Sequence, residues 1–203
     1  MTMKQLLSDA DLSIFNFAAG ISKFMGIKMH SAEEIDQTVR DLRAVQGSGL
    51  LIGGIAVIHH GYRRYTDDVD MLYANHDTEI LKRLKTNFKA VLKAKSGWHH
   101  FEHRKTHVRL ELIPEGGLGT YGFIPGPKTV GGEDGFISLH GLIWLKLVAG
   151  RMQDEADIAE IAKNNLKAVA AVRAKLPPEH HERFDALIAR AKKEIETDPN
   201  RHA

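Results

Sequence analysis

The sequence predicts an α/β protein of the α+β kind, in which a mixed β-sheet is flanked by helices and followed by a helical C-terminal part. Short apolar runs bounded by glycines alternate with amphipathic helical patterns in the first part of the chain, which is typical of such a sheet. Helical periodicity alone then continues toward the C-terminus. The 203 residues, of which 43% are hydrophobic, can bury a sizeable core, so a disordered chain is excluded.

Three regions are expected along the chain. They are an N-terminal helical extension over residues 1–30, an α/β core over 31–135 and a helical region over 136–203. The sequence contains no internal repeat and no long Ser-rich or Pro-rich linker. This organisation favours one compact core with helical extensions.

Each element of the core is predicted from a local pattern. Ser31 and Glu34 form a capping-box pattern at the start of the first helix, and apolar residues then recur at helical spacing. The strands are short apolar or β-branched runs, and the first of them ends at Gly53 and Gly54. In chain order the expected elements are a helix over 31–45, a strand over 50–52, a helix over 55–60, a strand over 67–73, an amphipathic helix over 77–92 and strands over 98–104 and 107–113.

The C-terminal region is predicted to be helical. Before it, residues 116–135 are rich in glycine and are expected to form a long loop. Pro177 and Pro178 separate the last helix from the one before it. The expected helices cover residues 138–150, 153–163, 166–175 and 179–197.

Composition excludes several classes of protein. With no cysteine, the chain has no disulfide framework, no thiolate nucleophile and no Cys-ligated metal. No apolar run is long enough to span a membrane, and the start of the sequence lacks the basic and apolar regions of a secretion signal. We therefore expect a cytoplasmic protein without a membrane partner.

Positive charge is concentrated in one segment, although the formal net charge is only +2. Residues 81–109 contain nine Lys or Arg and one acid, Glu102. Such a segment can face phosphates, which makes it a candidate surface for an RNA or a protein partner. The alternative is a solvated helix face whose lysines extend into water.

The most informative stretch is the strand expected over residues 67–73. Alternate residues of a strand share a face about 7 Å apart, so Asp68 and Asp70 point the same way and repel each other unless a cation lies between them. Oxygen ligands at this spacing suit Mg²⁺, which shares its ligand shell with water and substrate phosphates. A later strand places Glu111 on the face opposite its apolar residues. The alternative for Glu111 is a surface pair with Arg109 or a lysine.

Two further features are suited to phosphate. Gly53 and Gly54 follow a buried strand and open a helix, where they offer backbone N–H groups at the positive end of that helix. Lys146 lies on the apolar stripe of a predicted helix, and a buried ammonium group needs an anion. The alternative is that Lys146 extends past small neighbours into water. The charged side chains within residues 151–157 are explained by ion pairs across a helix start.

Two histidine-rich strings suggest other sites. Residues 99–103 contain H-x-x-E-H, the inverted zinc-protease string, but its histidines converge on a metal only on a helix, and this stretch is expected to be a strand. His59 and His60 are expected to line the helix after the glycines, and the alternative is that one of them touches substrate. The sequence contains no Walker phosphate loop, no dinucleotide fingerprint and no serine-hydrolase elbow.

Taken together, Gly53-Gly54, thirteen further residues and then Asp68-Val69-Asp70 resemble the nucleotidyltransferase superfamily, in its minimal and abortive-infection toxin-like branch. The string TDDVD at residues 66–70 is similar to the family's Thr-x-Asp-Ile-Asp, and the stretch LKLVAGRMQDEADI resembles the helical motif of that branch. The likeness covers roughly residues 33–165. It departs from the family pattern at Glu111, where an aspartate is usual.

The resemblance implies a nucleotidyltransferase-fold mixed β-sheet and a set of site residues. Asp68, Asp70 and Glu111 would be the catalytic residues and the ligands of Mg²⁺ or Mn²⁺. The nucleotide-binding residues would be Gly53, Gly54, Arg64, Thr66 and Lys146.

The implied reaction moves a nucleoside monophosphate from an NTP to a hydroxyl or phosphate of RNA, protein or a small molecule, with release of pyrophosphate. An RNA or protein acceptor would use the basic segment at residues 81–109. The alternative is a catalytically weak or inactive nucleotide-binding or partner-binding member of the same fold, such as a toxin–antitoxin component. An antitoxin or a second copy of the chain is then a candidate partner.

Overall fold

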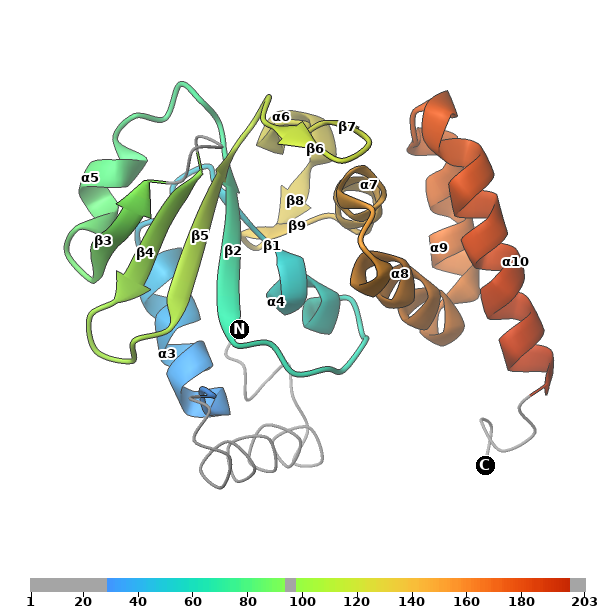
Figure 1. Cartoon of the computed structure of the whole chain (residues 1–203), viewed down its shortest axis with the longest axis horizontal. Coiled ribbons are helices and arrows are strands. Elements are labelled where there is room, and N and C mark those ends of the chain that lie inside the picture. The colour runs from blue at the N-terminus through green and yellow to red at the C-terminus, as the bar shows by residue number, and fades with distance from the viewer. Residues whose placement is uncertain (1–28, 94–97, 198–203) are drawn as a thin grey trace.

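The computed structural model describes residues 29–93 and 98–197 (Figure 1). They form a mixed seven-stranded sheet with the strand order β3-β4-β5-β2-β1-β9-β8, and the last helices gather at one side of the molecule (Figure 1). The expected fold class, a mixed α/β sheet flanked by helices with a helical C-terminal part, is confirmed. The N-terminal extension expected over residues 1–30 lies almost entirely outside the described residues.

The bounds of most elements agree with the sequence patterns. The strands of the sheet are β1 (Leu50–Ile52), β2 (Asp68–Tyr73), β3 (Phe88–Lys93), β4 (His99–His103), β5 (Arg109–Pro114), β8 (Gly132–Glu133) and β9 (Phe136–Ile137). A hairpin of β6 (Leu118–Gly119) and β7 (Gly122–Phe123) stands apart from the sheet. The helices are α3 (Ala32–Arg43), α4 (Gly53–His59), α5 (Ile80–Leu84), α6 (Pro127–Val130), α7 (Leu139–Ala149), α8 (Met152–Asn164), α9 (Leu166–Val172) and α10 (His181–Thr197).

Apolar side chains pack on both faces of the sheet. On one face, α3 and α5 cover a core that includes Val69 and Leu110 of the central strands. The capping box at Ser31 and Glu34 is present at the start of α3, as expected. On the other face, α4 and α7 to α10 pack around a second core that includes Ile113. Because side chains alternate along a strand, the polar residues of β2 and β5 lie on this second face.

The register of the central strands brings distant residues side by side. Strand β2 is parallel to β5, with Asp70 opposite Glu111, and antiparallel to β1, with Asp70 opposite Ile52. Strand β4 is antiparallel to β5, with His100 opposite Glu111. The polar residues of three strands therefore form one row across the sheet.

The prediction of a helix over residues 77–92 is wrong. Only Ile80–Leu84 is helical there, and Phe88–Lys93 forms β3, an edge strand that pairs with β4. The lysine-rich stretch has helical spacing, but Phe88 is buried against the sheet and the backbone takes its hydrogen bonds from β4. Pairing with a neighbouring strand overrides a weak local helix preference.

The loop expected over residues 116–135 also has more structure than its composition predicts. It contains the β6–β7 hairpin, the short helix α6 and the edge strand β8. Strand β9 at Phe136–Ile137 runs parallel to β1, so the sheet continues beyond residue 135, where the core was expected to end. None of the helices in the described part of the chain combines the length and apolar character needed to cross a lipid bilayer.

Candidate functional site

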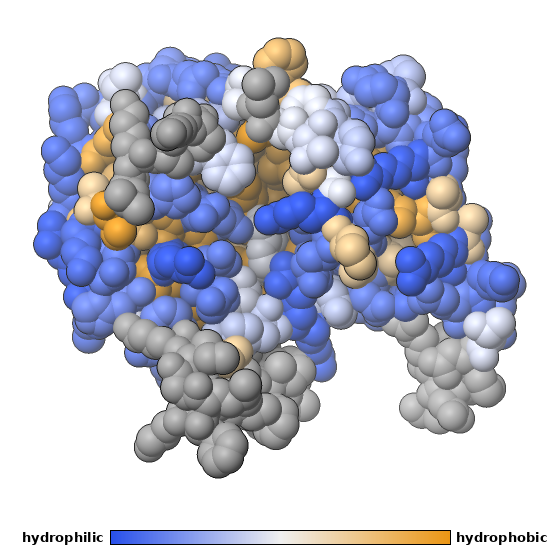
Figure 2. Space-filling model, viewed as in Figure 1, coloured by the Kyte–Doolittle hydropathy of each residue, from blue (hydrophilic) through white to orange (hydrophobic). Residues whose placement is uncertain are grey.

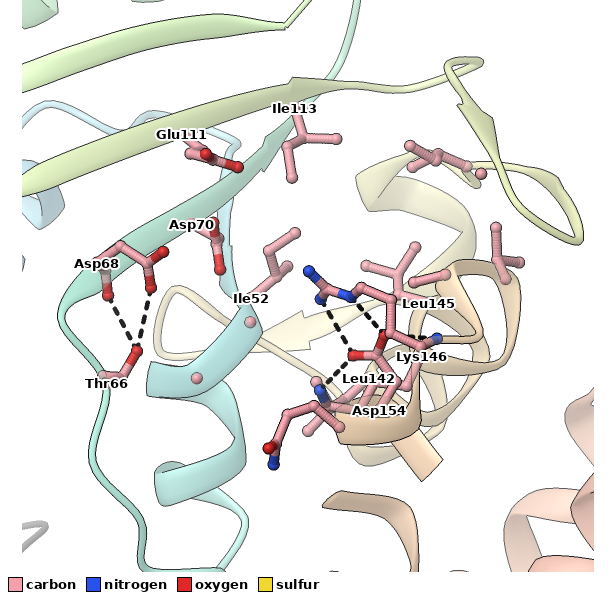
Figure 3. A pocket seen from close by; sticks show the side chains of 18 of the residues that line it. Ile52, Thr66, Asp68, Asp70, Glu111, Ile113, Leu142, Leu145, Lys146 and Asp154 are labelled. Carbon is pink, nitrogen blue, oxygen red and sulfur yellow. Dashed lines mark hydrogen bonds and ion pairs between the residues drawn. The ribbon is translucent and has the colours of Figure 1, made fainter. Parts of the chain in front are cut away.

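A cavity of about 530 Å³ lies between the second face of the sheet and helices α4, α7 and α8 (Figure 3). One wall is polar and carries Asp68, Asp70 and Glu111 from β2 and β5. The other wall is apolar and comes from the end of β5, from α7, from the segment around the β6–β7 hairpin and from the residue before β4. Its residues include Trp98, Ile113, Ile124, Leu142, Leu145 and Val148. The cavity thus offers both charged and apolar surface to a ligand.

The two aspartates of β2 share the cavity face, as strand alternation predicts. The hydroxyl of Thr66 donates to Asp68 Oδ1 over 3.2 Å (Figure 3). Within the described residues, no hydrogen bond or ion pair is found for Asp70. The strand thus presents one carboxylate held by a hydroxyl and one without a partner of its own.

The environment of Asp70 disfavours the charged form of its carboxyl group. Burial, followed by the charges of Asp68 and Glu111, raises the pKa of Asp70 from 3.8 to about 7. The nearby cations of Arg151 and Lys146 offset part of this effect. A carboxylate with such a pKa is stabilised by any cation that binds beside it.

Glu111 lies next to Asp70 in the parallel register, as Figure 3 shows from the cavity side. Its Oε1 atom is 3.5 Å from Nδ1 of His100 on β4. The alternative surface pair with Arg109 is not found among the described contacts, because the Arg109 guanidinium lies 3.6 Å from the carboxylate of Asp67 instead. Glu111 is therefore free to face the cavity.

The glycine pair at the start of α4 has a packing reason. Gly53 has φ +61°, and a Cβ atom there would lie 1.8 Å from Asp70 Oδ2. A Cβ atom at Gly54 would lie 2.4 Å from the hydroxyl oxygen of Thr66. Only glycine lets the helix start approach the aspartate strand so closely. Whether the backbone also binds phosphate stays a prediction.

Lys146 meets anions from its own chain. Its ammonium group lies 3.0 Å from Asp154 Oδ1 and 2.5 Å from Asp157 Oδ2, and its side chain is only 5% exposed. Arg64 adds a 2.8 Å contact to Asp157, and Arg151 adds one of the same length to Asp154. Lys146 is therefore buried and paired with anions, as the sequence predicts, and the alternative that it extends into water is wrong. A nucleotide phosphate as the anion stays a prediction.

The interpretation of residues 151–157 as ordinary ion pairs across a helix start is incomplete. Asp154 and Asp157 are buried, and they link α8 to Lys146 of α7 and to Arg64, far earlier in the chain. One signal was available in the sequence. Asp154 shares its helix face with Ile158 and Ile161, and an acid on an apolar stripe must pair with a buried cation.

No histidine of the two strings lines the cavity, although His100 lies beside the cavity-lining Glu111. The H-x-x-E-H string lies on β4, where Glu102 faces away from His99 and His103, so the three side chains cannot converge on one metal. His103 instead contacts Asp41 and Thr106, at 3.0 and 2.8 Å. The rings of His59 and His60 lie against β9, the first stacked on Phe136 and the second 2.8 Å from the Ile137 carbonyl oxygen.

Acids neutralise part of the basic segment over residues 81–109. Lys89 pairs with Glu102 over 2.9 Å, and Arg83 pairs with Asp77 over 2.8 Å. An RNA or protein acceptor at this segment stays a prediction.

The donor set at the cavity suits a divalent cation with oxygen ligands. Among the described residues, no three His, Asp or Glu side chains form a ready ligand cluster. Mg²⁺ does not require one, because it commonly takes one or two carboxylates and completes its shell with water and substrate phosphates. Asp68 and Asp70, which face the cavity from one strand, fit this requirement.

Comparisons with known proteins add a likeness of fold. No family model and no curated protein matches the sequence. Among solved structures, the chain is similar to the antibiotic-resistance factor ANT(2'')-Ia, with a TM-score of 0.47 and 13% sequence identity. The likeness covers 80% of this chain and 98% of that chain. These values transfer neither a reaction nor a substrate to this chain.

Proposed function

We propose that the protein is a nucleotidyltransferase that moves a nucleoside monophosphate from an NTP to an acceptor hydroxyl or phosphate and releases pyrophosphate. The observation that carries the proposal is the set of three carboxylates, Asp68, Asp70 and Glu111, on adjacent strands facing one cavity. The raised pKa of Asp70 supports it, because an acid held in this way favours a bound cation. The minimal and toxin-like branch of the superfamily, named from the sequence motifs, is part of this proposal.

In this reaction the acceptor oxygen attacks the α-phosphorus of the NTP. The bond from the α-phosphorus to the bridging oxygen breaks, and pyrophosphate leaves with that oxygen. Asp68, Asp70 and Glu111 would hold Mg²⁺ or Mn²⁺, which when bound supplies positive charge to the attacking and leaving oxygens. Glu111 would orient an acceptor hydroxyl and take up its proton. Most of the catalytic effect then comes from positioning and charge.

The remaining residues would bind and orient the nucleotide. Gly53 and Gly54 would offer backbone N–H groups to the β- and γ-phosphates. Thr66 holds Asp68 in place through its hydroxyl. Lys146 and Arg64 line the cavity and would contribute positive charge to it, and both pair with the buried Asp157. The apolar wall would receive the uncharged part of a substrate.

Arg151 is an additional candidate for phosphate, and the sequence motifs did not assign it. It lines the cavity, and its side chain is 76% exposed while it pairs with the buried Asp154. An exposed guanidinium held at one end by a carboxylate can still donate to a phosphate oxygen.

Since the reaction consumes an NTP, we retain the cytoplasm as the expected compartment.

The test is an assay with each of the four NTPs labelled at the α-phosphate. We expect transfer of label to an acceptor, or release of labelled product, with Mg²⁺ or Mn²⁺ and not with EDTA. Candidate acceptors are total RNA, protein and small-molecule extracts, and mass spectrometry identifies the modified species. NTP binding without turnover under all these conditions would contradict the proposal and favour the inactive binding protein.

Two substitutions at Glu111 test the third carboxylate in the same assay. Glu111→Asp keeps the charge on the same strand face and should retain measurable activity. Glu111→Gln keeps the length without the charge and should lose about 10²-fold or more in rate, the usual contribution of a positioned base. Steady-state rates at saturating Mg²⁺ measure both. A Gln variant as fast as wild type would remove Glu111 from the reaction.

A further inference from the structure

Glu111 has a neighbour that no step of the proposed reaction uses. The register aligns Ile52, Asp70, Glu111 and His100 in one row across β1, β2, β5 and β4. His100 therefore lies on the same face of the sheet as the carboxylates, directly beside Glu111. Residues on either side of it in β4 point the other way: Phe101 belongs to the core under α3.

The two side chains lie within ion-pair distance of each other. Nδ1 of His100 lies 3.5 Å from Oε1 of Glu111, and both side chains are 31% exposed. The other two carboxylates of the site show what this contact adds. Asp68 is held by the hydroxyl of Thr66 over 3.2 Å, whereas no described hydrogen bond or ion pair holds Asp70. Asp68 and Glu111 thus each have one side chain beside them, and Asp70 between them is left for a cation.

Glu111 needs such a neighbour more than an aspartate would. A glutamate has one more rotatable bond than an aspartate, so its carboxylate samples more positions on a half-exposed strand. An imidazole ring whose Nδ1 atom lies 3.5 Å from one oxygen limits the positions of the side chain and leaves the second oxygen for the cavity. Groups that orient a ligating carboxylate typically change metal affinity by about 10- to 100-fold when they are removed.

We propose that His100 is a positioning residue for Glu111, holding the longer carboxylate in the place where the reaction requires it. The inference rests on the proposed nucleotidyl transfer, since it assigns a task to Glu111. It adds a residue that contacts neither the NTP nor the cation and acts through Glu111 alone.

Two variants at His100 and one at His99 test this assignment. His100→Phe keeps the ring and removes the donor, and His100→Asn restores an N–H near the position of Nδ1. His99→Phe is the matched control, because His99 is the adjacent histidine of β4 and lies opposite Leu112 on the other face. Mn²⁺ affinity is measured by electron paramagnetic resonance, and kcat and KM for the NTP are measured separately.

For His100→Phe we expect Mn²⁺ binding to weaken about 10-fold and kcat to fall by a similar factor, with little change in KM. His100→Asn should stay within about threefold of wild type, as should His99→Phe. In a Glu111→Ala background, His100→Phe should have no further effect, because the group on which it acts is gone.

Each other result overturns the assignment. If wild type binds Mn²⁺ and transfers nucleotide while His100→Phe matches it, His100 does not position Glu111 and the proposed function stands. If His100→Phe weakens binding equally with and without Glu111, it acts through another group. If wild type neither binds Mn²⁺ nor transfers a nucleotide, the proposed function fails and the inference fails with it.

Discussion

Asp68→Asn and Asp70→Asn should each lower divalent-dependent nucleotidyl transfer by about 10³-fold or more. Each change removes a negative charge from the face that would hold the cation, and loss of one preorganised electrostatic group costs on this scale. Initial rates with labelled NTP at saturating Mg²⁺ measure the effect. Calorimetry should show weaker Mg²⁺ binding in each single variant than in wild type.

The control for this pair is Glu102→Gln. Glu102 is an acid of the same sheet that pairs with Lys89 and His107, and it does not line the cavity. Its substitution should leave the rate within about threefold of wild type, as expected for exposed ion pairs. Equal Mg²⁺ affinity in wild type and in the variant with both aspartates changed would contradict the cation site.

The stability of Asp70→Asn should depend on pH in a direction set by the raised pKa of Asp70, about 7 in the folded chain against 3.8 as its ordinary value. Below pH 3.8 both the folded and the unfolded state hold the proton, so Asp70 does not lower the stability of the folded state. As pH rises toward 7 the unfolded chain loses the proton first, and the folded state is progressively destabilised. Without divalent cation, Asp70→Asn should therefore raise Tm by a few degrees at pH 8 and by much less at pH 4.5. A gain confined to acid pH would contradict this account.

Lys146→Met should lower the free energy of unfolding by about 3 kcal/mol, or Tm by roughly 10 °C, because it leaves two buried carboxylates without their shared cation. Asp154 and Asp157 would retain Arg151 and Arg64, which keeps the loss near the lower end of the usual range. If Lys146 served only to bind a phosphate, the same substitution would weaken NTP binding with little loss of stability. The buried contacts of Lys146 reverse that expectation for stability.

A matched control for this substitution is Lys163→Met. Lys163 also contacts two acids, Glu160 and Glu194, but these are 29% and 37% exposed. Water can solvate them after the lysine is removed, so the loss should be about 1 kcal/mol or less. Thermal melts of both variants in the same buffer compare the two sites. Equal losses at Lys146 and Lys163 would mean that burial of the partners does not matter here.

The face on which each acid lies was determined by the sequence alone. Alternation along β2 and β5 is a local property of extended backbone, so the cavity face of Asp68, Asp70 and Glu111 could be predicted without knowing which strands are neighbours. The capping box of α3 and the helices after residue 138 are local in the same sense. The mixed sheet followed by helices could be predicted for this reason.

What only the tertiary structure decided was the pairing of groups far apart in the chain. Asp70 and Glu111 become neighbours through the parallel register of β2 and β5, and Glu111 meets His100 through a further strand. Asp157 meets Arg64 across 93 positions. Residues 88–93 form a strand rather than a helix because β4 supplies their hydrogen bonds. These outcomes depend on the free energy of long-range contacts, which local propensity and spacing do not contain.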